Sequence, residues 1–184
     1  SLLKKFVEQY NLPFATTTMA KGLIDESHPL AVGCIERACR QHQRLFLDSA
    51  DLIIGIGYDT IEVEFEAWIG TTPLLQVDIE PVDIEPSVRL IHQVTEDLSK
   101  SLKYFLSKRS TKNSWALNEL AKHKEVFNKK LRPKADLFTA YEAIDAVRAA
   151  LPKNGILSFD VGAHTHQIAS QWNVPAHHSF LITN

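Results

Sequence analysis

An unbroken apolar run limits the folds open to this chain more than any other segment does. Residues 51–57 read Asp-Leu-Ile-Ile-Gly-Ile-Gly, with apolar side chains on consecutive rather than alternate positions. Such a strand is expected where both faces of a sheet are covered, as they are in parallel sheets. Further strands are expected at residues 74–79 and 88–94, and stretches with helical spacing separate the strands of the chain. The alternation predicts an α/β fold, a parallel sheet flanked by helices.

The remaining elements follow from helical spacing and from the positions of proline and glycine. Residues 29–33 are expected to form a loop or a helix start. Arg132-Pro133 interrupts a helical stretch, because proline disfavours helix in the residue before it. A domain boundary is therefore expected between residues 1–132 and 133–184. Other strands are expected at 14–18, 156–160 and 178–183, and helices at 2–10, 37–49, 95–105, 115–131, 136–151 and 166–172, with Thr95 and Asp136 as N-caps.

Composition excludes several classes of partner. The formal net charge is −2, which gives no reason to expect nucleic acid or an anionic membrane. The spacing of Cys34 and Cys39 fits neither a zinc site nor a redox pair, and both are expected to be packing residues. No signal peptide and no apolar run long enough to span a bilayer is visible, so the cytoplasm is the expected location.

A tight glycine turn is the first candidate site. Asp160-Val161-Gly162-Ala163-His164 follows the apolar run 156–159 and precedes an amphipathic run, His166 to Trp172. The pattern predicts a strand, a turn and a helix start. Backbone amides at a helix start point outward and carry partial positive charge, so the turn suits a phosphate group.

A second candidate site lies where residues 51–57 end. Ligands of open α/β sheets bind beyond the carboxyl ends of strands, and Gly57 could let a backbone approach a nucleotide closely. The dinucleotide pattern GxGxxG is incomplete, because Thr60 stands at its third glycine, so a turn without a ligand is an equal alternative. Asp78 could likewise accept from ribose hydroxyls or cap its own turn. Four histidines are not expected to bind metal, because no three or four ligands converge: His164, His166, His177 and His178.

Four stretches together resemble one family. Residues 17–30 are similar to the "TxxxKGxxxExHPL" segment of thiamine-diphosphate-dependent decarboxylases and carboligases. Residues 49–64 resemble their central-domain strand, followed by the "GYDPIEYE" run of catabolic acetolactate synthases. Residues 77–98 resemble the "hiDixpaeI…gDl" run, and residues 160–164 resemble the "DVGxH" turn that opens the cofactor-diphosphate domain. The order and spacing of these motifs agree with the family along nearly the whole chain.

The resemblance implies a three-domain enzyme that contains this chain. Residues 1–132 would be its Rossmann-like central domain with a trailing helix, the first strand lying before Ser1. Residues 133–184 would be the truncated start of the C-terminal cofactor-binding domain, and the chain's end in a strand is expected to be a cut. The implied reaction joins two pyruvates into 2-acetolactate and carbon dioxide, with thiamine diphosphate and Mg²⁺ as cofactors. The whole protein is expected to be a homodimer or homotetramer, and this chain alone is expected to be inactive.

The resemblance also implies roles for individual residues. Those that would approach the diphosphate are Val161, Gly162, Ala163 and His164. Those that match positions around FAD in anabolic synthases are Gly33, Gly57, Tyr58, Asp78, Ile79 and Asp97. Catabolic synthases do not need FAD, so an empty or degenerate nucleotide pocket is expected. No catalytic or metal-binding residue is expected within the chain. Glutamine is common in the family where Ala163 stands, which leaves the substrate open.

The sequence is also compatible with other functions. The chain could be a free-standing nucleotide-binding module of the same fold, which would bind an adenine nucleotide. It could be a purely structural domain that holds two catalytic domains at the right separation. Another 2-oxo acid decarboxylase of the same family is a further alternative, since only residues 58–64 favour the synthase type.

Overall fold

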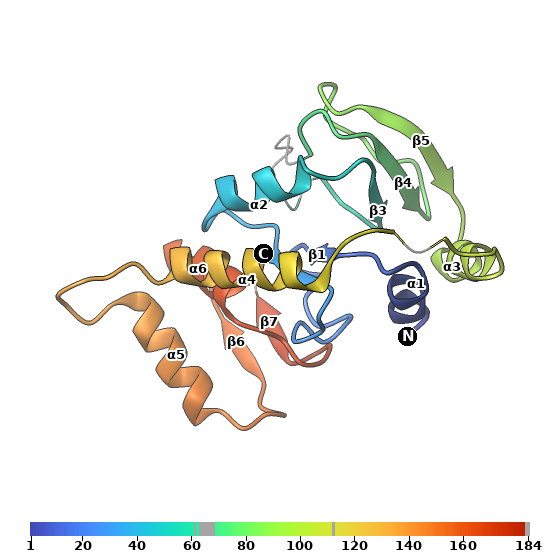
Figure 1. The fold of residues 1–184 in the computed structure, drawn as a ribbon. Coiled ribbons are helices and arrows are strands. Elements are labelled where there is room, and N and C mark those ends of the chain that lie inside the picture. The colour runs from blue at the N-terminus through green and yellow to red at the C-terminus, as the bar shows by residue number, and fades with distance from the viewer. Residues whose placement is uncertain (61, 63–68, 112, 183–184) are drawn as a thin grey trace. The chain divides into compact units, whose positions relative to one another are not determined.

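The strand pairings among the described residues are all parallel. A computed structural model describes residues 1–60, 62, 69–111 and 113–182 of the chain (Figure 1). The helices are α1 (Leu2–Tyr10), α2 (Arg40–Leu47), α3 (Leu98–Leu106), α4 (Leu117–Leu131), α5 (Ala140–Ala150) and α6 (Ala163–Gln171). The strands are β1 (Phe14–Thr16), β2 (Ala31–Cys34), β3 (Ile53–Ile56), β4 (Leu74–Asp78), β5 (Leu90–Thr95), β6 (Leu157–Phe159) and β7 (Phe180–Ile182). The chain forms two compact units, residues 1–12 with 41–113 and residues 13–40 with 114–184.

The first unit is built on the sheet β3-β4-β5. In the middle strand β4, Leu74 and Val77 are almost wholly buried although they point to opposite faces, as expected for a strand whose two faces are covered. Helices α1 and α3 pack together beside this sheet (Figure 1), and Phe6 lies with its ring centroid 5.6 Å from that of Phe105. Asn11 ends α1 in a left-handed conformation, φ 54°, which asparagine tolerates better than most residues.

The second unit holds two short parallel pairs, β1-β2 and β6-β7. Helix α6 connects β6 to β7 and packs against α5 (Figure 1), which forms the strand–helix–strand unit typical of parallel sheets. A hydrophobic core cluster of this second unit contains Ile144, Ile168, Trp172 and Val174. Helix α4 contacts both β2 and α6, and its buried residues are Leu120, His123, Phe127 and Leu131.

The α/β class with parallel strands flanked by helices is confirmed. The strands of the described residues form three parallel sheets, ordered β1-β2, β3-β4-β5 and β6-β7. The predicted boundary between residues 132 and 133 stays a prediction. No helix within the described ranges combines the length and the apolar character needed to cross a membrane.

Three local predictions are wrong, and in each case an interaction seen in the structure overrides the local sequence preference. Residues 31–34 form a strand rather than a loop or helix start, because they pair with β1 and overcome the local proline and glycine signal. Thr95 remains in β5, paired with Asp78, so Asp97 caps α3 instead by accepting from Lys100 N at 2.9 Å. Thr139 rather than Asp136 caps α5, since its capping box with Glu142 satisfies both backbone amides reciprocally.

The buried faces of α2 and α4 do not simply follow the apolar residues. In α2, Leu45 is 70% exposed while Gln43 is 2% exposed. The helix starts only at Arg40, because Cys39 has a left-handed backbone, φ 57°. In α4, Leu117 is 53% exposed, and the aromatic side chains of His123 and Phe127 are buried in its place. Tertiary packing therefore decides which helix face is covered where the apolar spacing is irregular.

Candidate functional site

The glycine turn leads from β6 into α6, as the sequence predicts. Gly162 is the N-cap residue and supplies no side-chain cap to the first turn of the helix. Thr165 donates from its backbone N at 2.9 Å and from its hydroxyl at 2.7 Å to the carbonyl oxygen of Gly162. Helix-start amides without a side-chain cap point outward as donors, so the turn can bind an anion there.

The side chains of the turn leave room around these amides. Val161, Ala163 and His164 are exposed. The His164 ring folds back over Gly162, so that a Cβ on Gly162 would lie 2.7 Å from Cε1 of the ring. The turn therefore needs glycine for as long as His164 keeps this position. An imidazole beside an anion-binding helix start is also placed to donate a hydrogen bond to the anion.

A buried ion pair connects residues 16–26 to the segment that follows α6. Lys21 Nζ lies 2.8 Å from Glu26 Oε2, with only 3% and 9% of the two side chains exposed. The same carboxylate accepts from the hydroxyl of Thr16 at 3.2 Å and from the backbone N of Val174 at 2.8 Å. The backbone N of Glu26 donates to the carbonyl oxygen of Val174 at 3.1 Å. Each carboxylate oxygen thus has several donors, which buried charge requires.

Gly22 makes this close approach sterically feasible. Its φ is +82°, and a Cβ there would lie 2.6 Å from the carbonyl oxygen of Ala176 and 2.7 Å from Cγ1 of Val174. Glycine is needed both for the backbone conformation and for the space. Lys21 and Gly22 belong to residues 17–30, the stretch that resembles the thiamine-diphosphate enzymes, which we call the family-like segment. They therefore fix the position of residues 174–176, just after α6.

A second carboxylate, Glu36, contacts the first turns of α6. His166 Nδ1 lies 2.9 Å from Glu36 Oε1, and the hydroxyl of Thr18 donates to Glu36 Oε2 at 3.0 Å. Sequence reasoning treated His166 only as a rejected metal ligand and did not single out Glu36. The two residues are 130 positions apart, so no local pattern could have joined them. Together with Glu26, Glu36 fixes both ends of α6 to the family-like segment.

The carboxyl edge of the first unit's sheet brings together most of the predicted nucleotide positions. The backbone N of Gly57 donates to the carbonyl oxygen of Val77 at 2.9 Å. Gln76, which sequence reasoning missed, donates from Nε2 to the carbonyl oxygen of Tyr58 at 3.0 Å and to Asp78 Oδ2 at 3.3 Å. Burial, with a smaller contribution from Glu62 and Asp59, raises the pKa of Tyr58 to about 12. Its phenol therefore stays protonated and remains a hydrogen-bond donor at neutral pH.

The two predicted aspartates of this edge already bind backbone groups. Asp78 Oδ1 accepts from the backbone N of Ile79 at 2.7 Å, and Asp97 accepts from the first turn of α3. Ile79 itself is 65% exposed. Gly33 belongs to the other unit, in β2 with φ 113°. The structure thus brings Gly57, Tyr58 and Asp78 together. Ile79 follows Asp78 in the chain, and Asp97 follows Glu96, whose backbone N donates to the carbonyl oxygen of Asp78 at 2.8 Å.

Metal-ligating side chains do not gather in the part of the chain that is described: no group of three His, Cys, Asp or Glu there could hold an ion. His177 and His178 lie with their ring centroids 4.7 Å apart. Both cysteines are among the described residues, and neither forms a disulfide. Within the run 58–64 used for the synthase resemblance, residues 61, 63 and 64 lie outside the described residues.

Comparison with known proteins gives consistent findings. Residues 1–105 match the family model described as "Thiamine pyrophosphate enzyme, central domain". A probable acetolactate synthase large subunit from Methanococcus aeolicus is 26% identical, over 97% of this chain and 33% of the relative. A 2-hydroxyacyl-CoA lyase 1 from Homo sapiens is 30% identical, over 90% and 30%, and an oxalyl-CoA decarboxylase from Escherichia coli is 27% identical, over 89% and 30%. The chain thus spans about a third of the length of these curated relatives.

Proposed function

Because the chain belongs to the thiamine pyrophosphate enzyme family, we propose that it contributes two parts to a decarboxylase or carboligase of 2-oxo acids. One part is the central domain, and the other is the turn that binds the cofactor's diphosphate. The observation that carries the proposal is the glycine turn, where α6 begins at Gly162 without a side-chain cap. A diphosphate is the kind of anion that such a helix start favours.

Each residue of the turn has a distinct task in this proposal. The backbone amides of Ala163 and His164 bind the diphosphate, and Gly162 keeps the approach open. The imidazole of His164 donates a hydrogen bond to a phosphate oxygen. Glu26 and Glu36 position the turn from behind, through Val174 and His166. When bound, thiamine diphosphate would supply a nucleophilic carbon that adds to a 2-oxo acid and accepts the electron pair as carbon dioxide leaves.

Magnesium is the family's usual companion of the diphosphate, but this chain's described residues do not fit it. They contain no group of three candidate ligand side chains, and Mg²⁺ requires near-octahedral oxygen ligands. In the proposal, the protein ligands of Mg²⁺ come from outside these residues, and no step is assigned to the ion here.

Acetolactate synthase, acting on two pyruvates, is the specific activity that we propose. It is supported by the Tyr58-Asp59 sequence after β3 and by the relative of that name. The engagement of Asp78 and Asp97 by backbone amides supports a version that works without FAD. We expect the whole protein to be a cytoplasmic homodimer or homotetramer. Neither nucleic acid nor membrane is expected as a partner, since the formal net charge of this chain is only −2.

The names of the other relatives define the competing activities, and one substrate panel separates them. The whole protein that carries this chain is supplied with thiamine diphosphate and Mg²⁺, then with pyruvate, oxalyl-CoA or a 2-hydroxyacyl-CoA. The expected result is 2-acetolactate from pyruvate, measured as acetoin after acid treatment, with neither thioester consumed. Consumption of a thioester alone would contradict the synthase assignment and retain the family chemistry. No turnover of any of the three, with the cofactor bound, would contradict both.

A further inference from the structure

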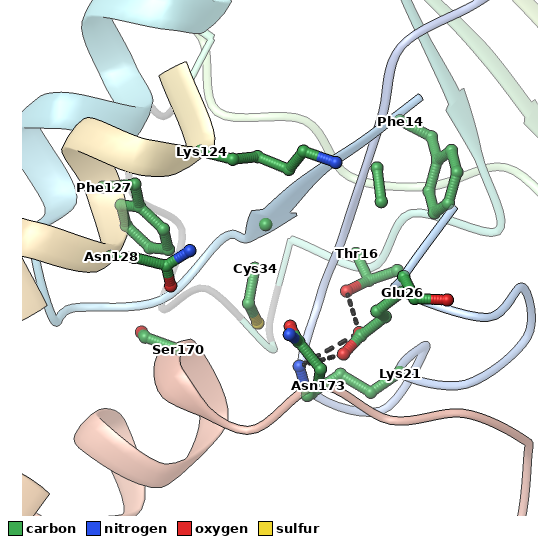
Figure 2. A pocket seen from close by; sticks show the side chains of 13 residues that line it. Phe14, Thr16, Lys21, Glu26, Cys34, Lys124, Phe127, Asn128, Ser170 and Asn173 are labelled. Atoms are coloured by element: carbon green, nitrogen blue, oxygen red, sulfur yellow. Dashed lines mark hydrogen bonds and ion pairs between the residues drawn. The ribbon is translucent and has the colours of Figure 1, made fainter. Parts of the chain in front are cut away.

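A polar cavity lies inside the second unit, apart from the glycine turn. Its volume is about 260 Å³, and its walls come from β1, β2, α4, the end of α6 and the segment around Glu26 (Figure 2). None of Val161, Gly162, Ala163 and His164 lines it. The cavity is large enough for a small metabolite and too small for a nucleotide, because nucleotide and drug-sized ligands occupy sites of roughly 300–1,000 Å³.

Among the described residues around this cavity, one cation, Lys124, has no acidic partner. Lys21 and Glu26 neutralise each other in their buried pair. Lys124 reaches from α4 across the cavity (Figure 2), where its Nζ has only long contacts, to the carbonyl oxygens of His28 at 3.4 Å and Pro29 at 3.5 Å. No carboxylate of the described residues forms an ion pair with it. A partly desolvated ammonium in this setting favours an anion as its partner.

Uncharged polar groups complete the cavity. Asn128, Ser170 and Asn173 line it, with Ser170 near Asn128 and Asn173 farther away in the view of Figure 2. Within the described residues, the Ser170 hydroxyl makes one long hydrogen bond, to the carbonyl oxygen of Ala38 at 3.5 Å. Phe127 supplies an apolar wall. Amides and a hydroxyl can bind a carbonyl or hydroxyl group beside a carboxylate, while a single lysine can balance a single negative charge.

We infer that this cavity is a binding site for a small hydroxy- or oxo-monocarboxylate, held by Lys124 at its carboxylate. Asn128, Asn173 and Ser170 bind the ligand's hydroxyl or oxo group. A phosphate or dicarboxylate fits less well, because its second charge would have no cation to meet it. The inference does not depend on the proposed thiamine chemistry, since the cavity shares no residue with the glycine turn.

Binding at this site is non-covalent. The Cys34 thiol lies in the cavity wall, but burial raises its pKa to about 12, with Glu26 and Glu36 adding to the effect and Lys21 opposing it. The thiol therefore remains protonated at neutral pH and is a poor nucleophile. Complete reversibility on dilution is the expected behaviour of the ligand.

The experiment uses L-lactate as the probe, because lactate carries the carboxylate and a hydroxyl but lacks a 2-oxo group. Lactate and the neutral lactamide are each titrated into the whole protein. Binding is monitored by the NMR chemical-shift changes of the backbone ¹⁵N amides of Ser170 and Asn173. Variants are Lys124→Met and, as a matched control, Lys122→Met, which removes the same charge from the exposed face of α4. The expected result is saturable lactate binding, weakened at least about tenfold by Lys124→Met alone, with no binding of lactamide.

Three results would overturn the inference. They are the absence of saturable shifts at Ser170 and Asn173 in the unaltered protein, equal lactate affinity in the Lys124→Met variant, and lactamide binding as strong as that of lactate. If Lys124→Met does not fold, the titration of the unaltered protein with lactate and lactamide still decides the outcome.

Discussion

The carboxylate of Glu26, in the loop after β1, and that of Asp78, the last residue of β4, are held in opposite ways. Asp78, in the first unit, binds groups that lie 1 and 2 positions away in the sequence. Glu26, in the second unit, binds groups 5, 10 and 148 positions away. Asp78 therefore stabilises only its own turn, whereas Glu26 fixes the end of the helix that begins at the glycine turn. The difference teaches that a motif's function can depend on partners that its local sequence does not contain.

The largest expected effect comes from removing the buried cation that pairs with Glu26. Lys21→Met should lower the free energy of unfolding by about 3–5 kcal/mol, because it leaves Glu26 as a buried charge without its cation. Urea denaturation, followed by tryptophan fluorescence, measures the change. The control is Lys4→Met, whose pair with Glu8 is half exposed and should contribute less than about 1 kcal/mol.

A double variant shows whether the effect belongs to the pair. Lys21→Met combined with Glu26→Gln should cost less than the sum of the two single changes, since neither charge is then left alone. If the losses of unfolding free energy in the two single variants simply add up in the double variant, Lys21 stabilises the unit by packing and not by its charge. The contrast between the charge interactions of Glu26 and those of Asp78 would then be contradicted.

The second prediction compares one glycine from each unit. Gly22→Ala combines a φ of +82° with a 2.6 Å approach to the carbonyl oxygen of Ala176, and should cost roughly 3 kcal/mol. Gly57→Ala has a similar φ, +59°, but its nearest neighbour is Leu98 Cδ1 at 3.6 Å, so it should cost only roughly 1 kcal/mol. Thermal unfolding of both variants measures the difference, and equal shifts in Tm would contradict the close packing at Gly22.

The third prediction tests a purely local interaction. Asp97→Ala removes the N-cap of α3 and should lower stability by about 1 kcal/mol. Thr95→Ala should have a smaller effect, because Thr95 belongs to β5. Hydrogen exchange of the first α3 amides reads the cap directly, and greater loss of protection in Thr95→Ala would restore the sequence-based assignment.

The smallest expected effect concerns Asp145. Its hydrogen-bond partners, Arg132 and Gln171, lie 13 and 26 positions away in the sequence, between the extremes of Asp78 and Glu26. Hydrogen bonds from Arg132, at 2.8 Å to each carboxylate oxygen, lower the pKa of Asp145, with Gln171 adding to the effect and burial opposing it. A lowered folded-state pKa stabilises the fold above the unfolded value of about 4 and loses this contribution as the pH falls through the folded value. The stability difference between the unaltered protein and Asp145→Asn should therefore be constant near neutral pH and vanish in acid. A difference that grows in acid would contradict the sign.

The sequence predicted what local forces decide. Residues 2–10 are helical as expected, and β3, β4 and the turn into α6 lie where apolar runs and glycine place them. It failed at β2, where strand pairing overrides the local signal, and at α2, where packing buries Gln43. At the candidate site, the glycine turn was predicted, but the Glu36–His166 contact and the Glu26–Val174 bond were not. Contacts between residues far apart in the sequence produce no periodic pattern of apolar residues, so the sequence alone could not predict them.

The most direct test of the central claim is a titration of the whole protein with thiamine diphosphate, unaltered and with Ala163→Asp. An aspartate in the first turn of α6 should hold or slightly raise the stability of the free protein, because it meets the positive end of the helix. The same carboxylate would repel the diphosphate, so the account predicts affinity at least about tenfold weaker without loss of Tm. Ala163→Asn is the matched neutral control and should bind the cofactor normally. Equal affinity of Ala163→Asp and the unaltered protein would contradict the placement of the diphosphate at this turn.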